Sequence, residues 1–309
     1  MPQIAPIAYH GGQFVPTQDA HVPIMTQALQ YGTGVFEGIR AYVQDDGGHA
    51  LFRAPEHFRR FLSSCRMLRI EVGFSVEELC ELCVELLRRC DVEGDLYVRP
   101  LAYKFRLMPG TPPGVQLTGV SDALSINAFA MGSYTNKSGI KCAISSWRRP
   151  PDYVLPVRAK ITGGYVNNAI ALDDARAAGY ADAILLNTRG RVAEASTSNV
   201  FAVRDGRLMT PPASADLLEG ITRDTALVLA AGAEGLTCEV TDLGREDLFT
   251  ADEVFLAGTG AELVPVVEIA GQVIGSGRPG PVTTYLMSAY ADVVRGRDSR
   301  HRDWLLPVS

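Results

Sequence analysis

Lysine is scarce in this chain of 309 residues: Lys104, Lys137, Lys141 and Lys160 are the four lysines among 29 basic residues. Chemistry that needs an amine as nucleophile therefore has few candidates. Acidic residues number 35, which gives a formal net charge of −6. Because phosphate binding needs a net basic surface, this balance argues against nucleic acid as the main partner.

Long apolar runs are missing as well. The longest, such as residues 226–231, fall far short of the about 18 apolar residues that a membrane helix needs. No lysine or arginine precedes Arg40, so the basic start of a signal or transit peptide is missing. We therefore expect a soluble protein of the cytoplasm.

Cysteine is rare too, and the six cysteines are too few for a disulfide scaffold. Cys80 and Cys83 form a C-x-x-C pair inside a helical pattern, and no second pair follows at metal-binding spacing. We expect both to pack in the core. The five histidines show no H-x-x-x-H spacing. We therefore expect no metal site.

Strand and helix signals alternate irregularly along the chain, with more strands than helices and many hairpin turns. This order favours an α+β fold over regular βαβ repeats. The small polar segment 132–139 (GSYTNKSG) is typical of a loop between domains. We expect a small N-terminal α+β domain over residues 1–130, an inter-domain loop over 131–139 and a larger C-terminal domain over 140–309.

Several elements have clear signals. Ser75 and Glu78 form a capping box before a helix, and Pro55 suits the first turn of another. Asp205-Gly206 is typical of a hairpin turn. The predicted helices cover residues 166–178, 221–231 and 282–295. The predicted strands cover 95–103, 123–130, 141–146, 183–187 and 253–256, with a hairpin over 9–14.

Lys160 is the most informative lysine, because its segment 157–165 is apolar and runs through a glycine turn into a helix. Burial of such a lysine lowers its pKa and frees the amine to attack a carbonyl. The alternative is a surface lysine whose stem covers apolar neighbours. Of the others, Lys137 falls in the polar loop, Lys141 is expected to face solvent, and Lys104 is expected to end a strand.

Glu194 is a second candidate. The small residues 195–198 follow it, and they would let a flat ligand or another backbone come close. The alternative is a solvated carboxylate at the surface.

Two segments offer backbone amides to an anion. Gly220 permits a tight entry into a helix, where the amides of Ile221 and Thr222 and the Thr222 hydroxyl would face the anion. The loop 258–261 (GTGA) offers a second group of amides. Arg60, on the first long helix, could reach a phosphate. The alternatives are an ordinary loop and a solvated or salt-bridged arginine.

Seven segments, taken in order, resemble the branched-chain-amino-acid aminotransferases, which are class IV (fold type IV) pyridoxal-phosphate enzymes. The order and spacing of these segments run through nearly the whole chain. They are Tyr31–Tyr42 (YGTGVFEGIRAY), Glu56–Arg60 (EHFRR), Tyr97–Pro100 (YVRP), Ala159–Lys160 with Tyr165, Glu194–Ser196 (EAS), Leu218–Arg223 (LEGITR) and Gly258–Glu262 (GTGAE). The resemblance implies a small N-terminal α/β sandwich-like domain and a larger C-terminal pseudo-barrel domain.

Carried over to the matching positions, the resemblance implies pyridoxal 5'-phosphate as cofactor. Lys160 would anchor it covalently and move the proton in catalysis. Glu194 would face the pyridine nitrogen and keep it protonated, and Tyr165 would donate to the phenolic oxygen. The residues that would hold the phosphate or pack on the ring are Arg60, Ile221, Thr222, Thr259 and Leu218.

The resemblance also implies an apolar substrate pocket with two carboxylate sites. The amides of Gly260 and Ala261 and the Tyr97 hydroxyl would take the α-carboxylate. Arg99 and Arg40 would take the second carboxylate of 2-oxoglutarate or glutamate. The remaining pocket residues are Phe36, Gly38 and Tyr134, with Tyr31 reaching across from a partner subunit, which implies a homodimer or a larger homo-oligomer.

The reaction implied is transamination of L-leucine, L-isoleucine and L-valine with 2-oxoglutarate. Three single positions depart from the common family pattern, namely Met131, Gly164 and Gly260, and residues 195–199 are closer to other class IV enzymes. The substrate preference therefore stays open to a D-amino-acid or (R)-amine transaminase, or to aminodeoxychorismate lyase. From a different class, a phosphate-binding module without catalysis, or another phosphate-using enzyme, is the alternative.

Overall fold

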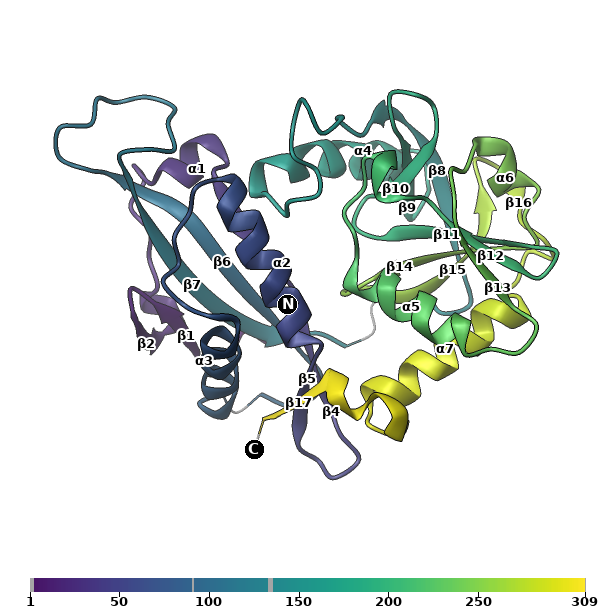
Figure 1. Ribbon diagram of the computed structural model, residues 1–309, viewed down its shortest axis with the longest axis horizontal. Coiled ribbons are helices and arrows are strands. Elements are labelled where there is room, and N and C mark those ends of the chain that lie inside the picture. The colour runs from purple at the N-terminus through teal and green to yellow at the C-terminus, as the bar shows by residue number, and fades with distance from the viewer. Residues whose placement is uncertain (1–2, 91, 133–135, 309) are drawn as a thin grey trace. The chain divides into compact units, whose positions relative to one another are not determined.

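The chain divides into two compact units, each built around its own β-sheet (Figure 1). The computed structural model describes residues 3–90, 92–132 and 136–308. Unit 1 comprises Met1–Gly132, Ala159–Gly164 and Val293–Ser309, and unit 2 comprises Ser133–Arg158 and Tyr165–Asp292. The domain division expected from the sequence stays a prediction, because the two units are defined by how tightly their residues pack and not by whether each folds alone.

The sheet of unit 1 has eight strands among the described residues, in the order β17-β5-β4-β6-β7-β1-β2 with β3 beside β6. The strands are β1 (Ile7–His10), β2 (Gln13–Pro16), β3 (Gly34–Phe36), β4 (Ile39–Val43), β5 (His49–Phe52), β6 (Leu96–Leu107), β7 (Val120–Ala130) and β17 (Leu305–Val308). The predicted hairpin over residues 9–14 is confirmed by β1 and β2, which pair antiparallel around a Gly-Gly turn.

The two faces of this sheet carry different residues. Strands β3 and β4 pair with β6 in one continuous register, with Phe36 opposite Leu101 and Arg40 opposite Tyr97. Because side chains alternate across a strand, the odd-numbered residues 35, 39 and 41 lie on one face, where all three are fully buried in the core. The even-numbered positions 36, 38 and 40 lie on the opposite face.

Helices α2 (Ala54–Met67) and α3 (Val76–Arg88) pack their apolar residues into the same core. The capping box is confirmed: Glu78 N–H donates to Ser75 Oγ (3.2 Å), and Ser75 N–H donates to the Glu78 carboxylate (2.7 Å). Cys80 and Cys83 lie buried in α3. Burial raises the pKa of the Cys80 thiol to about 12 and also raises that of Cys83, so neither thiol is poised for redox chemistry.

The expectation that Lys104 ends a strand is wrong. Strand β6 continues to Leu107 through a shift of register after Lys104. The lysine is buried, and its Nζ lies 2.8 Å from the Asp122 carboxylate. That ion pair lets a charged residue sit inside the strand. The expectation for Lys141 is confirmed, because its side chain is exposed.

The sheet of unit 2 closes on itself. Its order is β10-β9-β8-β15-β14-β11, and a further pairing between Glu194 of β10 and Asn199 of β11 joins the two ends into a ring of six strands. Those strands are β8 (Ile140–Arg148), β9 (Asp182–Leu186), β10 (Val192–Ala195), β11 (Asn199–Arg204), β14 (Glu253–Gly258) and β15 (Glu262–Ile269). Strands β12 (Arg207–Thr210), β13 (Thr237–Val240) and β16 (Gln272–Val273) extend it. The expected α+β fold with a barrel-like sheet is confirmed.

The remaining helices are close to the predicted ones where a local signal was present. They are α1 (Gln27–Tyr31), α4 (Tyr165–Ala177), α5 (Ile221–Ala231), α6 (Arg245–Phe249) and α7 (Pro281–Val294), with 3-10 turns at Thr17–Asp19, Thr162–Gly164, Ala213–Ala215 and Ser299–Trp304. Among the described residues, no helix combines the length and apolarity that a bilayer crossing requires.

Candidate active site

Lys160 belongs to unit 1, where its short segment docks on the strand end that carries Phe36. The Phe36 N–H donates to the Lys160 carbonyl (3.1 Å), and the Lys160 N–H donates to Ser64 Oγ of α2 (3.1 Å). The Lys160 Nζ lies 4.8 Å from the centroid of the Phe36 ring. The backbone is thus fixed on both sides, and the amine lies over an aromatic face.

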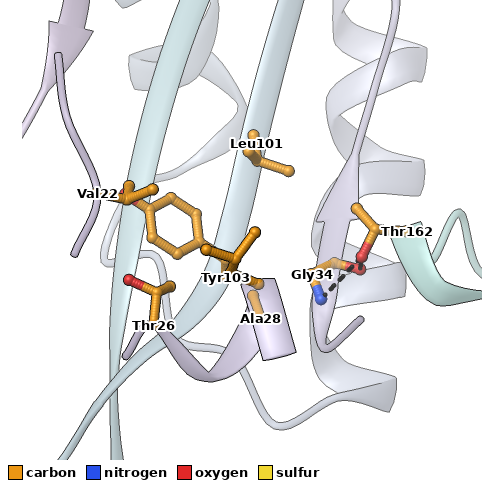
Figure 2. Close-up of a pocket in the computed structure, with 8 residues that line it drawn as sticks. Val22, Thr26, Ala28, Gly34, Leu101, Tyr103 and Thr162 are labelled. Atoms are coloured by element: carbon orange, nitrogen blue, oxygen red, sulfur yellow. Dashed lines mark hydrogen bonds between the residues drawn. The ribbon is translucent and has the colours of Figure 1, made fainter. Parts of the chain in front are cut away.

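The residues that follow Lys160 are held just as firmly. Thr162 Oγ1 donates to the Gly32 carbonyl (2.8 Å) and accepts from the Gly34 N–H (3.2 Å), the bond drawn in Figure 2. A cavity of about 190 Å³ lies beside this contact. Its lining is mostly apolar, including Leu101 and Tyr103, and holds no charged side chain. We assign no chemistry to the cavity.

Arg60 is bound to a carboxylate that the sequence interpretation missed. Glu37 is fully buried, and its two oxygens accept from Arg60 Nε (2.7 Å) and Nη2 (2.9 Å). The same carboxylate accepts from His57 Nδ1 (2.8 Å) and from the Gly38 N–H (3.3 Å). Glu37 lies on the sheet face that packs against α2, which carries both His57 and Arg60.

The protonation states in this cluster follow from burial and charge. Burial alone would raise the pKa of Glu37, but the Arg60 charge and the hydrogen bonds from His57 and Arg60 bring it well below its usual value. Burial lowers the pKa of His57, against the pull of Glu37 and with help from Arg60 and Lys160. A neutral His57 that donates from Nδ1 is the state that matches this geometry. The cluster of Glu37, His57 and Arg60 therefore carries no net charge.

The opposite sheet face brings four of the expected substrate residues together. The Arg99 guanidinium lies near two rings, 4.8 Å from the Phe36 centroid and 5.1 Å from the Tyr97 centroid. Arg99 Nη2 donates to the Tyr97 hydroxyl (3.3 Å), and Tyr97 stacks on Phe129 at 5.2 Å. Gly38 lies on the same face, directly against the Tyr97 hydroxyl.

Arg99 is placed to receive an anion. Its buried Nε has no hydrogen-bond partner among the described residues, and within that part of the chain no carboxylate forms an ion pair with it. A buried donor without a partner costs free energy. A ligand carboxylate is the group that would satisfy both the donor and the charge.

Three other expected substrate residues have different settings. Arg40 is buried, with Nη2 3.5 Å from the Asp95 carboxylate and its guanidinium 5.0 Å from the Tyr42 ring centroid. Tyr31 ends α1 and is 41% exposed. Tyr134 lies outside the described residues. All three assignments stay predictions.

Glu194 belongs to unit 2, where strand β10 holds it in a buried position. One carboxylate oxygen lies 2.9 Å from Arg149 Nη2. The other accepts from the Leu218 N–H (3.1 Å) and from the Asn199 side-chain amide (3.4 Å). Glu194 is therefore not a solvated surface carboxylate. Its charge is matched by a buried arginine.

Arg149 is itself held in place by neutral acceptors. Its Nη1 donates to Asn168 Oδ1 of α4 (2.6 Å), and its Nε donates to the Asp216 carbonyl (3.3 Å). The Asn168 side-chain amide then donates to the Ser196 carbonyl (2.5 Å). The network fixes the segment of small residues that follows Glu194.

Helix α5 begins close to Glu194 because Asn199 serves both. The Asn199 amide also donates to the Leu218 carbonyl (2.9 Å), and Gly220, the N-cap of α5, makes no side-chain capping bond. A Cβ at position 220 would lie 2.2 Å from Asn199 Oδ1, so only glycine fits there. Thr222 is buried in the first turn. The α5 N-terminus thus presents the positive end of a helix dipole.

The loop between β14 and β15 carries Thr259, Gly260 and Ala261, all half-buried. Lys137 Nζ lies 2.8 Å from the Glu262 carboxylate at the end of this loop. Glu262 has a φ of +62°, which turns the chain sharply back into β15. Tyr165, the first residue of α4, is also half-buried.

The sequence interpretation missed four residues of these networks: Glu37, His57, Arg149 and Asn199. Glu37 had a usable signal, since it takes an inward position in an alternating strand pattern, where a carboxylate requires a cationic partner. His57 stands in the quoted EHFRR segment, but its partner Glu37 is 20 residues away, and Arg149 had no signal because its partner is also distant in sequence. No cluster of three metal-ligating side chains occurs in the part of the chain that the structure describes.

Comparisons with known proteins test the resemblance that the sequence motifs indicate. Residues 34–269 match the family model of amino-transferase class IV. The chain is 42% identical to a probable branched-chain-amino-acid aminotransferase of Aquifex aeolicus, over 97% of this chain and 96% of that protein.

Solved structures give the same result. The fold is similar to that of the branched-chain aminotransferase from Thermoproteus uzoniensis with norvaline (TM-score 0.93, 37% identity, 99% of this chain and 100% of that one). It is also similar to the PLP-form (holo-form) of the branched-chain amino acid aminotransferase from Thermobaculum terrenum (TM-score 0.93, 35% identity, 99% of each chain). The resemblance indicated by the sequence motifs is confirmed.

Proposed function

The chain belongs to the amino-transferase class IV family, and from that premise we propose that it transfers the amino group of L-leucine, L-isoleucine or L-valine to 2-oxoglutarate. The products are the branched-chain 2-oxo acids and L-glutamate. The cofactor is pyridoxal 5'-phosphate. The structural observation that carries the proposal is Glu194, a buried carboxylate whose charge an arginine sustains.

The residues present fit this cofactor. Its phosphate needs cationic or amide donors, which Arg60 supplies in unit 1 and the N-terminus of α5 supplies in unit 2. Its ring nitrogen needs an ionised carboxylate, which Glu194 supplies. Its aldehyde needs a lysine amine, which Lys160 supplies. When bound, the cofactor provides an electron-withdrawing ring that stabilises negative charge at the substrate Cα.

Lys160 has two tasks in this proposal. Its Nζ would hold the cofactor covalently, and as a free amine it would carry the proton to and from the substrate Cα. Both tasks require a fixed backbone and a mobile side-chain end. The bonds from the Lys160 backbone to Phe36 and Ser64 provide the first, and the four-carbon stem provides the second.

Glu194 holds the proton on the pyridine nitrogen, and Arg149 keeps Glu194 ionised while it does so. Tyr165 is assigned to the phenolic oxygen of the cofactor and Leu218 to the face of its ring. The phosphate is assigned to Arg60, Ile221, Thr222 and Thr259. The roles of these residues come from the family motifs that they match.

The substrate residues divide by chemistry. The ring faces of Phe36 and Tyr97 offer an apolar surface to a branched side chain, while Arg99 offers a charge to the second carboxylate of 2-oxoglutarate. The α-carboxylate is assigned to the Tyr97 hydroxyl and to the amides of Gly260 and Ala261. Gly38, Arg40, Tyr31 and Tyr134 complete the proposed set.

The alternative reactions on this fold are not favoured. D-amino-acid transamination and aminodeoxychorismate cleavage would be compatible with Lys160 and Glu194. However, the relatives at 35–42% identity over nearly the full chain are named branched-chain-amino-acid aminotransferases. A substrate panel of L-leucine, D-alanine and aminodeoxychorismate separates the three. A preference for either of the last two would refute the branched-chain assignment.

The test of the chemistry is Lys160→Ala. The purified protein is expected to be yellow and to lose its visible absorbance on borohydride treatment, and Lys160→Ala is expected to lose both the covalent cofactor and about a thousandfold or more of turnover. Lys141→Ala is the matched control, because Lys141 is exposed. Retention of a borohydride-stable adduct by Lys160→Ala would show that another lysine is the anchor.

We also propose that the protein acts in the cytoplasm as a homodimer or larger homo-oligomer. All six cysteines are free thiols, as expected for a reducing compartment. Tyr31 is partly exposed at the end of α1, as a residue that serves a partner subunit must be. Analytical ultracentrifugation tests the assembly, and a monomer at micromolar concentration would contradict it.

A further inference from the structure

Gly38 lies between β3 and β4, and its backbone conformation does not itself require a glycine. Its φ is not among the positive values of the described residues, so an alanine could adopt the same conformation. The space is what excludes a side chain. A Cβ at position 38 would lie 1.7 Å from the hydroxyl oxygen of Tyr97 and 2.2 Å from its Cζ.

The Tyr97 ring cannot easily move out of the space that a Cβ at position 38 would need, which we call the Gly38 slot. Tyr97 is 8% exposed and stacks on Phe129 with centroids 5.2 Å apart and planes inclined by 29°. Its hydroxyl also accepts from Arg99 Nη2 at 3.3 Å, near the upper limit for such a bond. A shift that restores an ordinary contact with a Cβ would break this bond.

Arg99 depends on Tyr97 for its position. Its guanidinium contacts the Tyr97 and Phe36 rings, and its Nη2 donates to the Tyr97 hydroxyl. Since no described carboxylate pairs with Arg99, these contacts alone set where its charge is presented. An arginine released from them regains rotamer freedom, which a ligand carboxylate must then remove on binding.

We propose that Gly38 is the residue that sets the preference of this site between a dicarboxylic and a branched-chain 2-oxo acid, by admitting the Tyr97 hydroxyl that fixes Arg99. A branched-chain acid has no second carboxylate and does not use the Arg99 charge. A dicarboxylic acid does. Gly38 is thus a positioning residue, and the inference rests on the transaminase function proposed above.

The experiment measures KM for 2-oxoglutarate and for 4-methyl-2-oxopentanoate in the holoenzyme and in Gly38→Ala. The ratio of the KM for 2-oxoglutarate to the KM for 4-methyl-2-oxopentanoate is expected to rise about tenfold in Gly38→Ala, because the KM for 2-oxoglutarate rises. The kcat is expected to change by less than about threefold. Gly132→Ala is the matched control, since a Cβ there meets nothing within 4 Å. Its ratio is expected to equal that of the parent.

A double-variant cycle identifies the path of the effect. In a Tyr97→Ala background no tyrosine hydroxyl fills the Gly38 slot. Adding Gly38→Ala to that background is therefore expected to leave the KM ratio unchanged. An effect of Gly38→Ala that persists in that background, or one that raises both KM values equally, overturns the proposal. If Gly38→Ala does not fold, Tyr97→Phe tests the same bond, because it keeps the ring and removes only the hydroxyl, and an unchanged ratio overturns the proposal.

Failure of this inference is distinct from failure of the proposed function. If the parent protein shows no leucine-dependent turnover of 2-oxoglutarate, the transaminase function is wrong. If the parent turns over both acids and the KM ratio is the same in Gly38→Ala as in the parent, only the role proposed for Gly38 is wrong.

Discussion

The two units each bury one glutamate beside one arginine, but the roles of the partners are exchanged. In unit 1 the arginine is the working group: Arg60 is assigned to the cofactor phosphate, and the fully buried Glu37 supports it through two hydrogen bonds. In unit 2 the carboxylate is the working group: Glu194 is assigned to the pyridine nitrogen, and Arg149 supports it.

The two arginines differ in how many contacts they make. Both carboxylates also accept from neutral donors, Glu37 from His57 and the Gly38 N–H and Glu194 from the Leu218 N–H and the Asn199 amide. Arg60 donates to both oxygens of Glu37, whereas Arg149 contacts one oxygen of Glu194. A buried charge that loses its counter-ion is strongly destabilising, and the loss grows with the number of contacts removed. The pair in unit 1 is therefore the more fragile of the two.

The largest difference is expected from Arg60→Gln. It leaves the Glu37 carboxylate buried without its arginine, and we expect a loss of about 3–5 kcal/mol in the free energy of unfolding, measured by urea denaturation. Arg59→Gln is the control on the same helix, because Arg59 is exposed and lies 3.9 Å from Glu56. It is expected to cost under about 0.5 kcal/mol. Equal losses would contradict the role of the buried pair.

A smaller loss is expected from Arg149→Met, about 2–3 kcal/mol, because Arg149 contacts only one Glu194 oxygen and two neutral donors still reach the other. The neighbouring Arg148→Met is the control, since Arg148 is exposed and donates only to backbone carbonyls. Urea denaturation of the parent and both variants measures the effect. If Arg149→Met costs more than Arg60→Gln, the order of fragility proposed for the two pairs is wrong.

The smallest effect concerns pH, and its sign differs between the units. Burial lowers the pKa of His57 below 6.5, so the unfolded chain takes up the proton first and stability is lost as pH falls below about 6.5. The pKa of Glu37 is also lowered, which adds a loss below about 4.5. In unit 2, burial raises the pKa of Asp182, so the folded chain takes up that proton first and stability is gained as pH falls through it.

Urea midpoints recorded between pH 4 and pH 8 test this contrast. His57→Gln is expected to flatten the loss below pH 6.5. Asp182→Asn is expected to steepen the decline at lower pH, because it removes the compensating gain. The same change of slope in both variants would contradict the assignment of opposite signs.

Local chemistry predicted much of the fold. The Ser75 capping box, the Asp205-Gly206 turn and the helix over residues 221–231 were all recognisable because their signals lie within a few residues of each other. The extension of β6 beyond Lys104 was not, because the ion pair that permits it joins Lys104 to Asp122 on the next strand. Contacts between neighbouring strands, such as this ion pair, cannot be predicted from the local pattern of a single sequence.

The same limit holds for the candidate site. Lys160 and Glu194 stood out by family motif, but the partners that position them are distant: Phe36 and Ser64 for the lysine, Arg149 for the glutamate. Periodicity placed Arg60 on a helix without revealing that Glu37, 23 positions earlier and between β3 and β4, binds it. The ring closure of the unit 2 sheet rests on a single paired position, Glu194 with Asn199, and no local pattern predicts it.

The composition of unit 1 has a consequence for biosynthesis. Strand β5 takes β17 as a neighbour, with Leu305 opposite Phe52, and the segment Ala159–Gly164 also belongs to this unit. When only the first 132 residues have left the ribosome, the sheet of unit 1 therefore still lacks its edge strand β17, and the unit lacks Lys160. Unit 2 can complete its ring earlier, since its strands are consecutive in synthesis from β8 to β16. The later half of the chain is thus expected to fold before the earlier half is finished.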